Sequence, residues 1–145
     1  MANGALRETM AAACFTGMLY YAAVFTFAFA MGIARVLVVA PRLGSTVAVL
    51  LEMPVVVMAS WLVARRLLRN RCFELTQRGA MGATAFTLTM ASEAALSVIM
   101  LGQGMTDWAA ALATPLGLAG LAGQVAFAAM PLFLGHGPTD TLPTV

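Results

Sequence analysis

The sequence predicts an all-α membrane protein built as a bundle of four transmembrane helices. Of its 145 residues, 61% are hydrophobic and only 10% are charged. Soluble domains, by contrast, are about 45–50% apolar and about 25% charged. So few charges cannot cover the surface of a water-soluble domain of this size. The composition therefore excludes a soluble globular enzyme, a disordered chain and a basic nucleic-acid-binding protein.

Four long apolar stretches supply the helices, because a spanning helix needs about 20 mostly apolar residues. The first stretch has no charge from Thr9 to Ala34, the second holds Glu52 as its single charge, and the third holds Glu93. The fourth is uncharged, and Pro115 is expected to bend it near one end. None of the four alternates polar with apolar residues as a barrel strand would. We place the helices of this single domain at residues 11–40, 43–64, 79–101 and 108–134.

The arginines predict the orientation. All eight basic residues are arginines, and five of them lie in the loop 65–78 between the second and third helices. Cytoplasmic loops collect Lys and Arg, so we place this loop inside. Four helices then put Arg7 and the tail 135–145 inside as well, and Arg42 outside. The predicted topology is N-in/C-in in a bacterial-type inner membrane, with the loop arginines as a candidate site for anionic lipid head groups.

Three ionisable residues lie inside the predicted spans: Arg35, Glu52 and Glu93. Such a group at the centre of a span costs about 2.5–3.5 kcal/mol and normally faces the bundle interior beside a partner. From the helical rise, Glu52 lies about 13 Å, Glu93 about 12 Å and Arg35 about 8 Å from the outer ends of their helices. We therefore expect one buried ion cluster of all three. Two carboxylates beside one Arg cannot both ionise cheaply, so one is expected to hold a proton.

Secondary residues surround this predicted cluster. Pro54 cannot donate to the carbonyl of Leu50, so a free carbonyl is expected beside Glu52, as a proton, cation or polar-solute site needs. Gln124 lies about sixteen residues from the predicted start of the fourth helix, which places it deeper than the acids, as a hydrogen-bonding contact between helices. A ridge of small residues is expected to pack against another helix. It consists of Gly117, Gly120 and Gly123.

No motif in the sequence indicates a metal, a cofactor or catalysis. His136 is the single histidine, and no cysteine or acid pair accompanies it, so no metal is expected. The motifs of nucleotide hydrolases, zinc proteases and serine hydrolases are absent. The expected partners are the lipid bilayer and either a second copy or another membrane protein, because four helices leave packing surface uncovered. Nucleic acid is not an expected partner.

Short strings spread over nearly the whole chain carry a resemblance to one kind of protein. They are Gly32–Arg35, Pro41–Gly44, Leu51–Pro54, Ser60-Trp61, Gly82–Glu93, Gly123-Gln124 and Pro131-Leu132. With these strings the chain resembles small four-helix bacterial membrane proteins that have no assigned activity. The resemblance implies the fold and a bacterial membrane, but no function.

Three functions stay open at this level. The first is binding or translocation of a small polar or cationic solute, or of protons, with Glu52 and Glu93 as the exchanging groups and Arg35 holding one of them ionised. The second is a non-catalytic accessory or assembly subunit in which the ion cluster only fixes helix packing. The third is a membrane-embedded enzyme that modifies a lipid with the two carboxylates as acid and base. Nothing in the sequence orients such a substrate, so the sequence favours a protein that is not an enzyme.

Overall fold

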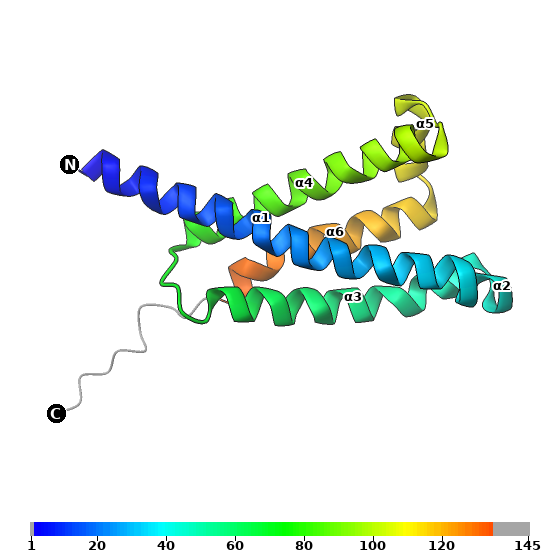
Figure 1. Ribbon diagram of the computed structural model, residues 1–145, viewed down its shortest axis with the longest axis horizontal. Coiled ribbons are helices and arrows are strands. Elements are labelled where there is room, and N and C mark those ends of the chain that lie inside the picture. The colour runs from blue at the N-terminus through cyan, green and yellow to red at the C-terminus, as the bar shows by residue number, and fades with distance from the viewer. Residues whose placement is uncertain (1, 135–145) are drawn as a thin grey trace.

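The computed structural model describes residues 2–134, with side chains from Thr9 onward. All regular elements in this part are helices (Figure 1). In chain order they are α1 (Ala2–Ala34), the π-helix η1 (Arg35–Val39), α2 (Ala40–Leu43), α3 (Ser45–Leu68), α4 (Leu75–Leu101), α5 (Met105–Leu112) and α6 (Pro115–Phe133). The side chain of Arg7, the tail 135–145 and His136 within it lie outside the described residues.

Four helical stretches within residues 2–134 are long and apolar enough to cross a membrane. They are Thr9–Leu43, Ser45–Leu68, Leu75–Leu101 and Pro115–Phe133. The first of them joins α1, η1 and α2 end to end. Many large apolar side chains point outward from the bundle, as a lipid-facing surface requires. The predicted all-α bundle with four membrane-spanning helices is confirmed, and these helices suggest a multi-pass membrane protein.

Local hydrogen bonding moves several helix ends from where we expected them. The first stretch continues through Pro41 to Leu43, because the proline lies in the turn directly after η1, where its missing N–H is tolerated. Gly44 alone then links α2 to α3, with a φ of 83° that glycine adopts without strain. α3 extends to Leu68. α4 begins at Leu75, before the expected residue 79, because Glu74 caps it in a reciprocal capping box.

Pro115 does not bend the fourth helix, and this expectation was wrong. The chain breaks into α5 and α6, and Pro115 takes the first position of α6, where a residue needs no N–H. Thr114 precedes it as the N-cap, and its hydroxyl accepts the N–H of Gly117 at 3.1 Å. The proline therefore starts a new helix.

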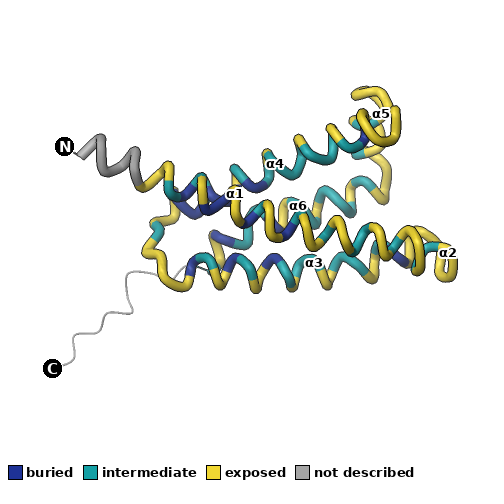
Figure 2. Tube along the Cα trace, viewed as in Figure 1, coloured by how far each residue is buried: buried dark blue, intermediate teal, exposed yellow. Residues whose placement is uncertain are grey.

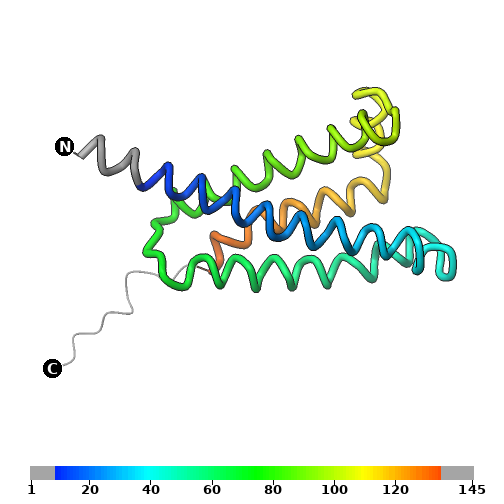
Figure 3. Tube along the Cα trace, in the orientation of Figure 1, coloured from blue at the N-terminus to red at the C-terminus, as the bar shows by residue number. Residues whose placement is uncertain are grey.

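The spanning helices form a ring in which each packs against two neighbours. α1 packs on α3 and α4, and α6 packs on the same two helices from the opposite side. The chain path in Figure 3 puts the α3–α4 link, residues 69–74, at one end of the bundle. The Gly44 turn and α5 lie at the other end. We call these two ends the link end and the turn end.

The spanning helices approach each other most closely in the half near the link end. A Cβ on Gly82 would lie 2.1 Å from the carbonyl oxygen of Ala128 in α6, and one on Gly17 would lie 2.5 Å from that of Met81 in α4. Only glycine fits at such backbone contacts, which are typical of packed membrane helices. Most of the buried residues gather in this half (Figure 2). We call it the closed half.

The side chain of Tyr20 reaches across the helix bundle from α1 to α6, at the inner edge of the closed half. Its side chain is fully buried, and its ring stacks on Phe127 of α6 with centroids 4.4 Å apart. Its hydroxyl donates to the carbonyl oxygen of Phe127 at 2.9 Å. The next residue, Tyr21, shares a hydrogen bond with Ser92 of α4. The two tyrosines therefore tie α1 to both α6 and α4.

Replacing Gly82 with alanine is expected to destabilise the protein. The added Cβ meets the backbone of Ala128, so α4 and α6 must separate, and overpacking of this kind costs about 1–3 kcal/mol. Gly120→Ala is the matched control, because nothing lies within 4 Å of a Cβ at that position. Thermal unfolding in detergent is expected to give a lowered Tm for Gly82→Ala alone. Equal Tm values for the two variants would contradict the close helix contact.

The N-in/C-in orientation stays a prediction from the arginines, and cysteine labelling tests it. Cys72 is free and exposed in the α3–α4 link, while Cys14 is free and half-buried. In a Cys14→Ser variant we expect a membrane-impermeant maleimide to label Cys72 in inverted vesicles and not in intact cells. A cysteine at the exposed Thr106 of the turn end, with both native cysteines replaced by serine, should give the opposite pattern. Labelling of Cys72 from outside the cell would overturn the orientation.

Candidate functional site

The half of the bundle near the turn end holds a cavity of about 760 Å³. Side chains of α1, η1, α3, α4 and α6 line it, and most of them are apolar or aromatic. Val24, Ser60 and Phe127 border the cavity on the side of the closed half, while Leu37 and Met100 lie toward the turn end. The lining also contains four strongly polar side chains, which form two pairs.

The cavity forms because α1 and α4 diverge toward the turn end (Figure 1). Past the contact of Gly17 with Met81, Phe25 and Phe29 are the bulkiest α1 residues that line this space, and their rings stack with centroids 6.2 Å apart. On the α6 side Gly120 contributes no side chain and leaves open space. Glycines thus let the helices come together in one half of the bundle, and the two phenylalanine side chains of α1 line the widening space in the other half.

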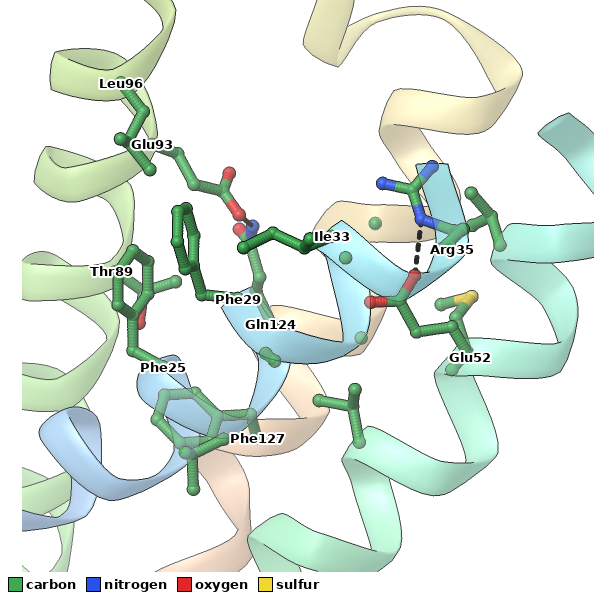
Figure 4. A pocket seen from close by; sticks show the side chains of 18 of the residues that line it. Phe25, Phe29, Ile33, Arg35, Glu52, Thr89, Glu93, Leu96, Gln124 and Phe127 are labelled. Carbon is green, nitrogen blue, oxygen red and sulfur yellow. Dashed lines mark hydrogen bonds and ion pairs between the residues drawn. The ribbon is translucent and has the colours of Figure 1, made fainter. Parts of the chain in front are cut away.

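The first polar pair joins the α1–α3 hairpin. The Nε of Arg35 lies 2.6 Å from Oε2 of Glu52, as the dashed line in Figure 4 marks. The Arg35 N–H does not point at the carboxylate well enough for a hydrogen bond, so the contact is an ion pair. Arg35 is the first residue of η1, a widened turn of a kind that often occurs at functional positions. The pair is electrically neutral as a unit.

The second polar pair joins α4 to α6. The Nε2 of Gln124 donates to Oε1 of Glu93 at 2.5 Å. The other side-chain oxygen of Gln124, Oε1, is buried and has no hydrogen-bond partner. A carboxamide brings no charge, so this pair leaves the carboxylate of Glu93 without a cation.

The predicted cluster of three ionisable residues is wrong. Arg35 pairs with Glu52, while Glu93 lies elsewhere on the cavity wall against Gln124, with Ile33 drawn between the two pairs in Figure 4. Among the side chains described from Thr9 to Leu134, no ion pair involves Glu93. Helical rise gives the position of a residue along its helix axis only. Because α1 and α4 diverge, residues at one depth lie on different walls of the cavity.

The predicted depth of Gln124 is also wrong. We had counted from residue 108 as the start of one continuous helix, which put Gln124 below the acids. α6 begins at Pro115, so Gln124 is only nine residues along it, or about 13 Å deep. That is the level of Glu93, and the two side chains meet there. The expectation that Gln124 hydrogen-bonds another helix is confirmed.

The remaining predicted residues lie in different surroundings. Pro54 and Leu50 are not among the residues that line the cavity, so the carbonyl freed by Pro54 is not part of this wall. The glycines of the predicted ridge face three different neighbours. Gly117 lies against the backbone at the end of α5, Gly120 faces the cavity, and Gly123 lies against the Met53 side chain of α3.

The aromatic part of the cavity was missed by the sequence reasoning. Phe25 and Phe29, which line it, are not among the residues singled out from the sequence. Their spacing of four residues, shared with Tyr21, places all three on one face of α1, and that spacing was the available signal. Phe127 has no comparable signal, because only the fold brings it to Tyr20.

The chain matches no protein-family model, no curated protein and no solved structure. The resemblance stated from the sequence therefore stays a prediction. Among the described residues, no three His, Cys, Asp or Glu side chains gather as a metal-ligand set.

Breaking the first polar pair from one side is expected to destabilise the protein. Glu52→Gln leaves the Arg35 guanidinium uncompensated within the span, which costs up to about 2.5–3.5 kcal/mol and less where the side chain reaches the membrane surface. The double variant Arg35→Gln/Glu52→Gln removes both charges, so it should recover most of the loss. The single variant Arg35→Gln completes the set, and denaturant unfolding in detergent measures the free energy of unfolding of all three variants against wild type. If the double variant loses the sum of the two single losses, the side chains do not interact.

Proposed function

We propose that the chain is an integral protein of the bacterial inner membrane whose cavity binds a lipophilic organic cation. The observation that carries this proposal is the charge balance of the cavity wall. Arg35 and Glu52 neutralise each other, while Glu93 has only the uncharged Gln124 as a partner. One carboxylate without a cation therefore faces a mostly apolar space.

A lone carboxylate in such a place has two low-energy states. Ionised and unpaired it is costly, because apolar surroundings do not solvate its charge. It is stabilised either by taking up a proton or by pairing with a cation that enters the cavity. Glu93 is thus suited to exchange one for the other, which is the chemistry that carboxylates perform in proton-coupled transporters.

The rest of the wall favours an organic cation over an inorganic one. Inorganic cations need several oxygen ligands to replace their water, and this lining offers few. Phe25, Phe29 and Phe127 instead provide aromatic rings, which attract cations through their faces and also cover apolar groups. A volume of about 760 Å³ lies within the range of roughly 300–1,000 Å³ typical of sites for small organic ligands.

Binding of tetraphenylphosphonium to the purified protein tests the proposal. We expect wild type to bind this lipophilic cation, and Glu93→Gln to weaken the binding at least about tenfold, which corresponds to about 1.4 kcal/mol. Protons compete for the same carboxylate, so binding to wild type should weaken as the pH falls, and Glu93→Gln should lose that dependence. Radioligand binding at several pH values measures both effects.

Glu74→Gln is the matched control for this experiment. It removes a carboxylate at the link end, away from the cavity, and keeps the side-chain oxygen that caps α4. Its affinity and pH dependence should equal those of wild type. Arg35 and Glu52 are the other ionisable groups on the wall, so pH dependence that persists in Glu93→Gln would assign the exchange to that pair. Binding that is unchanged in Glu93→Gln would overturn the proposal.

A second function, that of a non-catalytic accessory subunit, is favoured by a different observation. Each polar pair joins two neighbouring helices, Arg35 with Glu52 between η1 and α3, and Glu93 with Gln124 between α4 and α6. Both pairs therefore also fix the packing of the bundle. In this case Glu93→Gln would lower the Tm while wild type binds no tetraphenylphosphonium.

A further inference from the structure

We infer that the link end carries a second site, which binds the phosphate group of an anionic phospholipid. The site is a hollow of about 690 Å³ at the end of α3 and the start of the link. Its lining consists of Arg66, Leu67, Arg69, Asn70 and Arg71. Three guanidinium groups and one carboxamide thus surround a single hollow.

The positive charge of this hollow is not neutralised by neighbouring acids. No acid lines it, and none of its arginines forms an ion pair with a described side chain. Glu74 is the acid nearest in sequence, but its carboxylate accepts the backbone N–H of Gln77 in the first turn of α4 and is occupied as a cap. Arg71 stacks on Phe73, with its guanidinium carbon 5.5 Å from the ring centroid, which orders the side chain and leaves its charge in place.

A buried arginine at the same end adds to this positive charge. Arg78 in the first turns of α4 is only 9% exposed. Its Nη1 donates to the carbonyl oxygen of Leu132 at 3.5 Å, and its Nε is buried without a partner. Buried charges are normally paired, yet no acid among the described residues pairs with this one. The link end therefore carries a concentration of positive charge that would be stabilised by a bound anion.

Chemistry and position both favour a lipid phosphate as that anion. The planar guanidinium group matches a phosphate with two parallel hydrogen bonds. The hollow lies around Leu68, where the membrane span of α3 ends, which is the level of lipid head groups. Arg65 stacks on Trp61 one turn earlier, with 5.1 Å from the guanidinium carbon to the ring centroid, and tryptophan is typical of the membrane interface. Leu67 adds an apolar contact for the acyl chains of a lipid.

Thermal unfolding of the full chain in lipid nanodiscs tests this inference. We expect added phosphatidylglycerol to raise the Tm of wild type above its value in phosphatidylcholine alone. In the variant Arg69→Gln/Arg71→Gln, the phosphatidylglycerol concentration needed for half of the rise should increase about 25-fold, since each basic residue contributes about a factor of five. Both side chains are exposed, so the variant is expected to fold.

The controls separate this site from other sources of the effect. Arg42→Gln removes an exposed arginine at the turn end and should respond to phosphatidylglycerol as wild type does. An unchanged response in Arg69→Gln/Arg71→Gln would overturn the inference. So would an equal rise with inorganic phosphate in phosphatidylcholine, which would assign the hollow to a free anion. A response that appears only after Asp140→Asn would show that the chain's own tail occupies the site. None of these outcomes depends on Glu93 or the cavity.

Discussion

Direct backbone contact between helices in one half of the bundle determines the rest of the structure. α4 lies against α6 at Gly82 and against α1 at Gly17, and Tyr20 bonds α1 to α6 across the ring. Within a membrane, apolar side chains gain little by leaving lipid, so such contacts and hydrogen bonds hold helices together. With the helices fixed there, the larger Phe25 and Phe29 occupy the widening space between α1 and α4, and the cavity follows.

The few charged groups of the described chain have different electrostatic tasks in its two halves. Toward the turn end, charge is nearly balanced: one ion pair is neutral, and only Glu93 is left to choose between a proton and a cation. At the link end, positive charge is in excess, because arginines without acid partners surround a hollow at the level of the lipid head groups. The first arrangement suits a ligand that enters the apolar interior. The second suits one that remains at the surface.

The sequence was sufficient for the helices and insufficient for the walls of the cavity. Apolar length alone predicts four spans, because each must satisfy its own backbone hydrogen bonds in lipid. Glu52 and Glu93 both line the cavity inside the bundle, but helical rise predicts only depth along the span. It cannot predict the lateral separation of two helices, which depends on where glycines allow the helices to touch. The predicted ion cluster was wrong for this reason. The level of Gln124 failed for a local reason, because Thr114 and Pro115 begin a new helix where we had expected a bend.

The two polar pairs have a mechanical consequence. Each pair lies within one half of the chain, Arg35 with Glu52 in the first and Glu93 with Gln124 in the second. The first and second halves can therefore rotate against each other at the turn end without breaking either pair, at the expense of apolar contacts and of the hydrogen bond between Tyr21 and Ser92. Leu37 lies roughly 25 Å from Tyr20 along the helix, so a rotation of about 5° at Tyr20 displaces it by about 2 Å. The contact between Tyr20 and Phe127 would then be the hinge of this rotation, which sets the width of the cavity toward the turn end.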